Sequence, residues 1–179
     1  SMITRTLQPH LHRLFGGYPA LTITGPRQSG KTTLARTAFP NLPYASLENP
    51  DTRRFALEDP RGFLAQFTHG AILDEVQNTP DLLSYLQGII DESGKSGLFV
   101  LTGSQNFTLS RSISQSLAGR TAVLTLLPLS LAELSESGDE KPTEIDHHLL
   151  HGFYPRLKTH PGIEPNRFYA DYYQSYIQR

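Results

Sequence analysis

The sequence predicts an α/β fold, in which a five-stranded, mostly parallel sheet carries helices on both faces and is followed by a short helical segment. Three observations support this prediction. A glycine-rich loop stands between a strand-like and a helix-like segment. A second buried strand ends in two acidic residues. Further short apolar runs alternate with segments of helical periodicity, which is typical of parallel sheets joined by helical crossovers.

The glycine-rich loop covers residues 25–32 and fits the phosphate-binding P-loop pattern G-x-x-x-x-G-K-[ST]. An apolar strand over 20–24 precedes it, and a helix over 32–39 follows it. The glycines let successive backbone N–H groups point into one concavity and hold an anion. Lys31, which we count among the catalytic residues, supplies charge for the β- and γ-phosphates, and the Thr32 hydroxyl is placed to ligate Mg²⁺. The predicted phosphate-binding residues are Gly25, Pro26, Arg27, Gln28, Ser29, Gly30, Lys31, Thr32 and Thr33.

Residues 70–77 form the second half of the expected site. An apolar strand there ends in Asp74 and Glu75, which is the Walker B pattern. In this pattern the first acid holds Mg²⁺, usually through water, and the second polarises the attacking water as a general base. The pattern is weak alone and gains force from its position after the P-loop. We therefore predict Thr32 and Asp74 as Mg²⁺ ligands and Glu75 as a catalytic residue.

The segments around these motifs are expected to complete the layers of the fold. A short helix over 10–15, interrupted upstream by a proline, is expected to pack beside the sheet. A strand over 42–48 has Pro43 at its start, which suits a sheet edge. Helices over 51–57 and 61–67 are expected to form a covering layer around the nucleotide. The remaining expected elements are helices over 80–92 and 106–117 and strands over 98–105 and 121–127.

Some polar residues near these elements have two open interpretations each. Glu48 is either a carboxylate supporting the nucleotide site or an acid that begins the next helix. Ser104 and Gln105 are candidate catalytic residues that could bond the γ-phosphate or the lytic water, while Ser104 could instead cap the next helix. Arg120 could stabilise γ-phosphate charge, in its own chain or from a neighbouring subunit. Its other interpretation is a cation favoured by the dipole at a helix C-terminus.

The chain is expected to divide into three parts. Residues 1–135 form the core, in which Ser1 resembles a tag scar. Residues 136–146 are a polar linker. Residues 147–179 are the start of a truncated C-terminal helical domain. The aromatic helical pattern over 165–179 ends without a cap or breaker, which indicates a fragment of a longer protein.

The composition argues against several classes of protein. The chain of 179 residues has 16 Lys and Arg against 17 Asp and Glu, so its net charge of −1 gives no general footprint for nucleic acid, which stays an unproven partner. It has no cysteine, which excludes disulfides and cysteine-based metal sites and fits a reducing, cytoplasmic compartment. No apolar run approaches the length of a transmembrane helix, so no membrane partner is expected.

The segments GPRQSGKTTL, ILDEVQ, LTGSQ, SLAGR, LTLLPLSLAEL, GFYP and YYQSYIQR occur in this order along the chain. Together they resemble the prokaryotic AAA+-like ATPases that carry a C-terminal domain called DUF4143. The resemblance implies an ATP-binding core with strand order 5-1-4-3-2, followed by that second domain. It supports Gly25 to Thr33 for nucleotide phosphates, Asp74 and Glu75 for magnesium and water, and the polar end of LTGSQ for sensing, and it marks Arg120 as part of a recurring motif. The segment at 152–155 departs from the family, which commonly shows two glycines before the aromatic residue. The resemblance covers nearly the whole chain.

The first hypothesis for function is Mg²⁺-dependent ATP binding and hydrolysis by a core that drives or switches the C-terminal domain, with ATP or ADP and Mg²⁺ as cofactors. ATP is preferred to GTP by the resemblance, and the sequence has no N-K-x-D run of the kind that reads guanine. The alternative is a nucleotide-occupancy switch with very slow hydrolysis, which sets the posture of the C-terminal domain toward a protein or nucleic-acid partner. Self-association or a protein partner would act through that C-terminal domain.

Overall fold

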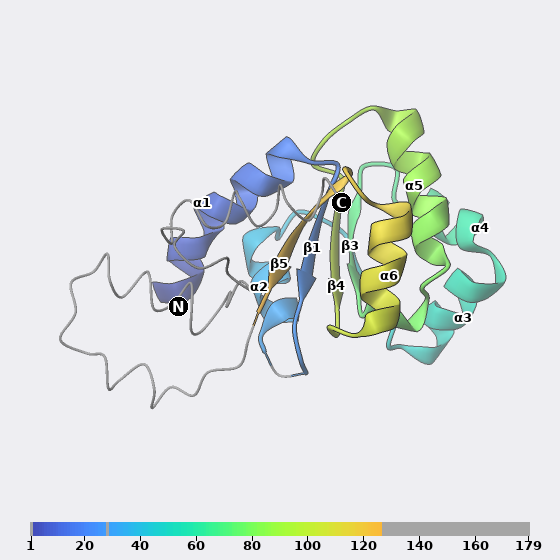
Figure 1. The fold of residues 1–179 in the computed structure, drawn as a ribbon, viewed down its shortest axis with the longest axis horizontal. Coiled ribbons are helices and arrows are strands. Elements are labelled where there is room, and N and C mark those ends of the chain that lie inside the picture. Colours follow the sequence, from blue (N-terminus) through green and yellow to red (C-terminus); the bar gives the residue numbers. More distant parts are fainter. Residues whose placement is uncertain (1, 28, 127–179) are drawn as a thin grey trace.

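The computed structural model describes residues 2–27 and 29–126, which form one sheet covered by helices on both faces (Figure 1). The strand order is β2-β3-β4-β1-β5, and every neighbouring pair is parallel. This is the predicted order read from the other edge, so the predicted fold class and strand order are confirmed. The strands are β1 (Ala20–Thr24), β2 (Tyr44–Ser46), β3 (Ala71–Asp74), β4 (Phe99–Gly103) and β5 (Thr121–Thr125).

The strands form where the sequence offers short, continuous apolar and β-branched runs. Every residue of β1, β3, β4 and β5 is buried, as expected for parallel strands covered on both faces. Strand β2 is half-buried and pairs only with β3, so it is the edge strand predicted from Pro43. The core of the domain therefore lies on both sides of the four fully buried strands.

The helices lie in two groups. Helices α1 and α2 pack together on one face, and α3 to α6 form a row of neighbours across the other (Figure 1). The connection from β1 to β2 runs along the sheet in one direction, and the connections from β2 to β3, β3 to β4 and β4 to β5 run in the other. Because such crossovers are right-handed, α2 lies on the face opposite to the helices of the later connections. The helices are α1 (Met2–Gly17), α2 (Lys31–Ala38), α3 (Pro50–Glu58), α4 (Pro60–Ala65), the 3₁₀ helix η1 (Val76–Asn78), α5 (Leu82–Ser93) and α6 (Phe107–Ser116).

Helix α1 is longer than the predicted helix over 10–15, because it continues through Pro9. A proline inside a helix removes one backbone hydrogen bond, and here the ring is exposed. Packing offsets that loss, since Leu11 is buried against the core. The His12 ring also donates to the carbonyl of Ala38 at 2.6 Å, which satisfies an unpaired group at the C-terminus of α2.

The parallel topology brings the carboxyl ends of the inner strands to one edge of the sheet. Thr24 at the end of β1 is level with Gly103 at the end of β4. The backbone N–H of Gly25 donates to the carbonyl of Gly103 at 3.1 Å, which ties the loop after β1 to β4. The segments that follow β1, β3 and β4 therefore meet at this edge, where ligand sites of α/β sheets form.

The predicted division into parts is only partly covered by the described residues. Residues up to 126 belong to the predicted core over 1–135. The predicted linker over 136–146 and the predicted C-terminal segment over 147–179 lie outside the described residues. Over the part of the chain that the structure describes, no helix has both the length and the apolar character needed to cross a membrane.

The turn into β3 depends on a glycine. Gly70 has φ +92°, and a Cβ added there would lie 1.7 Å from the carbonyl oxygen of Leu98. A side chain at this position would be strained by the backbone conformation and would also overlap a neighbouring backbone group. Gly94 offers a comparison, because its φ is +65° and nothing lies within 4 Å of an added Cβ.

We expect Gly70→Ala to lower the free energy of unfolding by about 3 kcal/mol or more, from left-handed strain plus overlap. Gly94→Ala carries the strain alone and should cost about 1–2 kcal/mol. Urea unfolding followed by circular dichroism measures both. An equal loss of unfolding free energy in the two variants would contradict the importance of the close contact between Gly70 and the Leu98 carbonyl.

Candidate functional site

The predicted phosphate-binding loop connects β1 to the N-terminus of α2. Gly30, at φ +82°, is the N-cap of α2, and no side chain caps this end. The first N–H groups of α2 therefore lack intrahelical partners and lie at the positive end of the helix dipole. Gln28 lies outside the described residues. A cavity of about 350 Å³ adjoins the loop and is lined by Arg27, Gly30, Lys31, Thr32, Thr33, Glu48 and Glu75.

A buried ion pair joins the two halves of the predicted site. Lys31 Nζ lies 2.9 Å from Glu75 Oε1, with both residues almost fully buried at 3% and 6% exposure. Lys31 Nζ also donates to the carbonyl of Pro26 at 3.4 Å. Glu75 has φ +62°, a left-handed conformation that is strained for a residue other than glycine. The structure thus brings the predicted phosphate-binding lysine and the predicted base into direct contact.

The Asp74 carboxylate accepts three hydroxyl hydrogen bonds. Thr32 donates to Oδ1 at 2.7 Å, Tyr44 donates to Oδ2 at 2.8 Å, and Thr102 also donates to Oδ1. The Thr102 oxygen in turn accepts the backbone N–H of Glu75 at 3.1 Å. Burial, followed by the hydrogen bond and charge of Asp74, raises the pKa of Tyr44 to about 12. Sequence reasoning missed Tyr44 and Thr102, whose proximity to Asp74 follows from the sheet order.

The donor set at Asp74 fits a magnesium ion. The Thr32 hydroxyl and the Asp74 carboxylate are hard oxygen donors 2.7 Å apart. Adjacent ligands of octahedral Mg²⁺ are separated by about 2.9 Å, given metal–oxygen distances of about 2.1 Å. Within residues 2–27 and 29–126 no cluster of three or more His, Asp or Glu side chains could hold a metal. The arrangement therefore suits an ion that takes its other ligands from water and phosphate.

Glu48 lines the cavity and forms an exposed ion pair with Arg27 of the loop. The side chain of Asn49, and not Glu48, caps α3 by accepting the N–H groups of Asp51 and Thr52. Of the two interpretations of Glu48, the geometry thus favours a carboxylate at the nucleotide site.

Ser104 is connected to the site through a residue that sequence reasoning missed. Gln77 accepts the backbone N–H of Ser104 at 3.1 Å, and its amide donates to the Ser104 hydroxyl at 3.4 Å and to Glu75 Oε2. Asn106 caps α6 instead of Ser104, since its side chain accepts the N–H of Leu109. Gln105 is exposed, and neither Ser104 nor Gln105 lines the cavity.

Arg120 lies at the opposite edge of the sheet. Its Nε and Nη2 atoms donate to the two carboxylate oxygens of Asp91 at 2.7 and 2.9 Å, which holds the pKa of Asp91 below its ordinary value. Its carbonyl accepts the N–H of Ala20, so Arg120 sits beside the start of β1. The P-loop begins five residues further along, at Gly25, roughly 16 Å away by the rise of a strand. Within one chain, the structure does not bring Arg120 to the predicted site.

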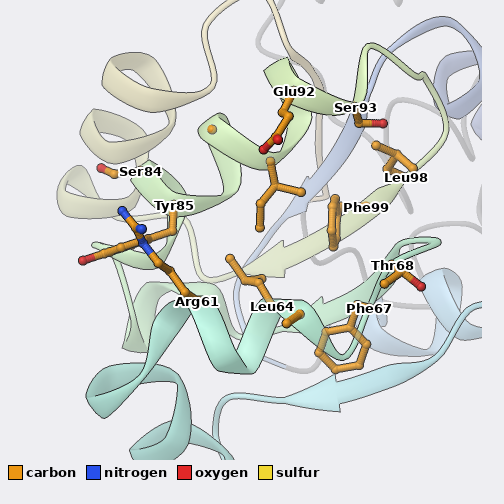
Figure 2. A pocket seen from close by; sticks show the side chains of 13 residues that line it. Arg61, Leu64, Phe67, Thr68, Ser84, Tyr85, Glu92, Ser93, Leu98 and Phe99 are labelled. Carbon is orange, nitrogen blue, oxygen red and sulfur yellow. The ribbon is translucent and has the colours of Figure 1, made fainter.

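Helices α3 and α4 do not cover the phosphate loop as predicted. They pack on β2 and α5, and none of the residues that line the loop's cavity comes from them. A larger cavity of about 660 Å³ lies between α4 and α5 at the start of β4 (Figure 2). Its walls are mainly apolar, with Leu64, Phe67 and Phe99 among the side chains that line it. It lies at the amino ends of the strands, away from the predicted phosphate site.

A family model described as an AAA domain matches residues 17–135. The match contains the whole phosphate loop, the strand that ends in Asp74 and Glu75, and the strand that ends before Ser104. It extends over more than half of the chain.

Two curated relatives resemble this chain in sequence. They are the uncharacterized protein Mb2031c of Mycobacterium bovis and the uncharacterized protein Rv2008c of Mycobacterium tuberculosis. Each is 33% identical over 140 residues, covering 76% of this chain and 31% of the relative. The chain therefore spans about a third of the length of these relatives.

Two solved structures resemble the fold. Domain III of the Thermotoga maritima replication initiation protein DnaA has 18% identity and a TM-score of 0.44, covering 82% of this chain and 72% of that one. A signal transduction ATPase with a tetratricopeptide repeat sensor from Pyrococcus horikoshii has 17% identity and a TM-score of 0.43, covering 94% and 32%.

We expect Thr102→Val to lower the free energy of unfolding by about 1–3 kcal/mol, because it leaves the buried Glu75 N–H without a partner and removes one of the two hydroxyl donors to Asp74 Oδ1. Thr22→Val is the matched control. Its hydroxyl bonds to Thr121, which also donates to the carbonyl of Ala122, so the loss should stay below about 1 kcal/mol. Urea unfolding measures the difference, and equal losses would contradict the role given to Thr102.

Proposed function

This chain belongs to the AAA domain family, and from that membership we propose that it binds ATP with Mg²⁺ and hydrolyses it at the phosphate loop. One observation carries the proposal above the others. Lys31 and Thr32, from the start of α2, directly contact Glu75 and Asp74, at the end of β3. The proposed phosphate-binding cation thus contacts the proposed base, and the two proposed Mg²⁺ ligands contact each other, beside one cavity.

In this proposal the loop from Gly25 to Thr33 holds the phosphates. The uncapped N–H groups at the start of α2 would donate to phosphate oxygens, and the buried Lys31 ammonium would neutralise β- and γ-phosphate charge. Thr32 and Asp74 would hold Mg²⁺, which when bound neutralises charge on the β- and γ-oxygens. The three hydroxyls on Asp74 hold its carboxylate in a fixed orientation before any ligand arrives.

Glu75 is proposed as the base. Its Oε1 contacts Lys31, so a γ-phosphate that attracts the lysine would release this oxygen to a water molecule. The water oxygen would attack the γ-phosphorus while the bond to the β–γ bridging oxygen breaks, and the water proton would pass to the Glu75 carboxylate. Low solvent exposure around both residues strengthens these interactions.

A nucleotide-occupancy switch is the second candidate, and the same ion pair supports it. Both carboxylate oxygens of Glu75 are engaged, Oε1 by Lys31 and Oε2 by Gln77, so the base is held back until Lys31 moves. A core of this kind would hydrolyse ATP slowly and report occupancy to a C-terminal domain of the DUF4143 kind in a longer protein. That domain would be the place for self-association, a protein partner or a nucleic acid.

We expect Lys31→Ala to weaken ATP binding roughly 10- to 100-fold, because it removes a charged donor to the phosphates. We expect Glu75→Gln to leave ATP affinity within about threefold and to lower kcat about 10²- to 10⁴-fold. Calorimetric titration with ATP, ADP and GTP in Mg²⁺ and a phosphate-release assay measure the two effects. Lys95→Ala and Glu58→Gln are exposed control substitutions that should change neither value.

The unpaired Glu75 carboxylate could destabilise Lys31→Ala, so the double variant Lys31→Ala/Glu75→Gln provides a neutral version of the same site. Unchanged ATP affinity in a folded double variant would contradict the proposed site. Unchanged turnover in Glu75→Gln would remove the base assignment alone. An intrinsic rate far below one per second that a partner stimulates would favour the switch, and a brisk intrinsic rate would count against it.

A further inference from the structure

We propose that Gln77 is a positioning residue, which couples the end of β4 to the carboxylate of Glu75. This inference rests on the proposed function, because it concerns how the same site holds its base. Gln77 lies in η1, directly after β3, and its side chain reaches both Glu75 and Ser104. It does not line the cavity beside the phosphate loop, so it acts through other residues.

Both polar atoms of the Gln77 amide make hydrogen bonds. Its Nε2 group donates to Glu75 Oε2 and to the Ser104 hydroxyl, while its Oε1 atom accepts the backbone N–H of Ser104. A flipped amide would place its oxygen against the carboxylate and its NH₂ group against an N–H donor, so only one orientation satisfies both partners. Gln77 therefore forms a link of fixed direction between a donor directly after β4 and an acceptor on the proposed base.

The surroundings leave the amide little freedom. A Cβ added at Gly103 would lie 2.9 Å from Gln77 Oε1 and 2.6 Å from Leu109 Cδ2, so the backbone of β4 comes close to the amide there. The backbone of Glu75 is held from the same strand, because Thr102 accepts its N–H. Strand β4 thus holds Glu75 twice, at the backbone through Thr102 and at the carboxylate through Gln77.

This double hold has a chemical consequence. Glu75 Oε1 faces Lys31, and Gln77 holds the other oxygen. When Lys31 turns to phosphate, Gln77 keeps the carboxylate from following the lysine or rotating away, and Oε1 stays at the position where water would be activated. A displacement of Ser104 would move the amide, and with it the base. The link therefore gives the end of β4 control over the orientation of Glu75.

The test compares turnover with binding in the 179-residue chain. Gln77→Met keeps the length of the side chain and removes its donor and acceptor. We expect it to lower kcat roughly 10- to 100-fold, while the ATP dissociation constant stays within about threefold. Gln77→Glu keeps an acceptor for Ser104 but places a second carboxylate against Glu75, so a similar loss is expected. Gln115→Met, an exposed glutamine on α6, is the control and should keep wild-type kcat.

Coupling to β4 is measured by a double-variant cycle. We expect Gln77→Met/Ser104→Ala to have nearly the same kcat as Gln77→Met alone, because Ser104→Ala removes only the hydroxyl that Gln77 Nε2 contacts, and any effect of that hydroxyl on Glu75 passes through Gln77. Fully multiplicative losses would overturn the coupling. A purely structural role would lower the melting temperature and leave kcat of the folded protein unchanged, and this result in both Gln77 variants would overturn the inference. A wild-type chain that binds no ATP or does not hydrolyse it would overturn the proposed hydrolysis, and this inference with it.

Discussion

The need to supply hydrogen bonds to the buried carboxylate of Asp74 is the constraint that holds several elements of this fold in place. A buried charge without hydrogen bonds costs several kcal/mol, so the chain has to supply partners for it. They come from three separate elements, through Thr32 at the start of α2, Tyr44 on β2 and Thr102 on β4. Since Asp74 itself ends β3, its carboxylate fixes the helix after β1 and both neighbours of β3 relative to one another. The phosphate loop and the acidic strand end thus depend on each other structurally.

A second buried interaction, between Lys31 and Glu75, has a different character. Burying both charges costs desolvation energy that their attraction repays only in good geometry, so such a pair is weak evidence for stability. Glu75 additionally adopts a left-handed conformation that costs about 1–2 kcal/mol. Backbone strain and buried charge are both found most often at functional sites, and Glu75 combines the two. The pair therefore fits the proposed roles of Lys31 and Glu75, a phosphate-binding cation and a base, better than it fits a role in stability.

The sequence predicted the framework because its signals are local. Apolar runs identify the strands, and the glycine-rich loop and the acidic pair are spaced so that a parallel sheet must bring them together. The residues it missed depend on neighbours in space. Tyr44 and Thr102 reach Asp74 only because β2 and β4 flank β3, and Gln77 reaches Ser104 only because η1 returns toward β4. These contacts follow from the order of the strands in the sheet, which the hydrophobic periodicity of the sequence does not reveal.

The start of the first helix and the position of Arg120 within its own chain differ from what was predicted, for identifiable physical reasons. Pro9 does not end the first helix, because tertiary packing outweighs the loss of one backbone hydrogen bond. Arg120 precedes a parallel strand, and residues there lie at the amino edge, opposite to the ends of β1 and β3 where the loop and the acids meet. The position of Arg120 before its strand already indicated this edge.

The most direct test of the central claim, that the phosphate loop and Asp74 form one site for nucleotide and metal, is the dissociation constant of ATP measured in Mg²⁺ and again in EDTA. Joint binding through Thr32 and Asp74 predicts that Mg²⁺ tightens ATP binding by at least about tenfold, and that Asp74→Asn removes most of this gain while the protein stays folded. Equal dissociation constants with and without Mg²⁺ would contradict the account.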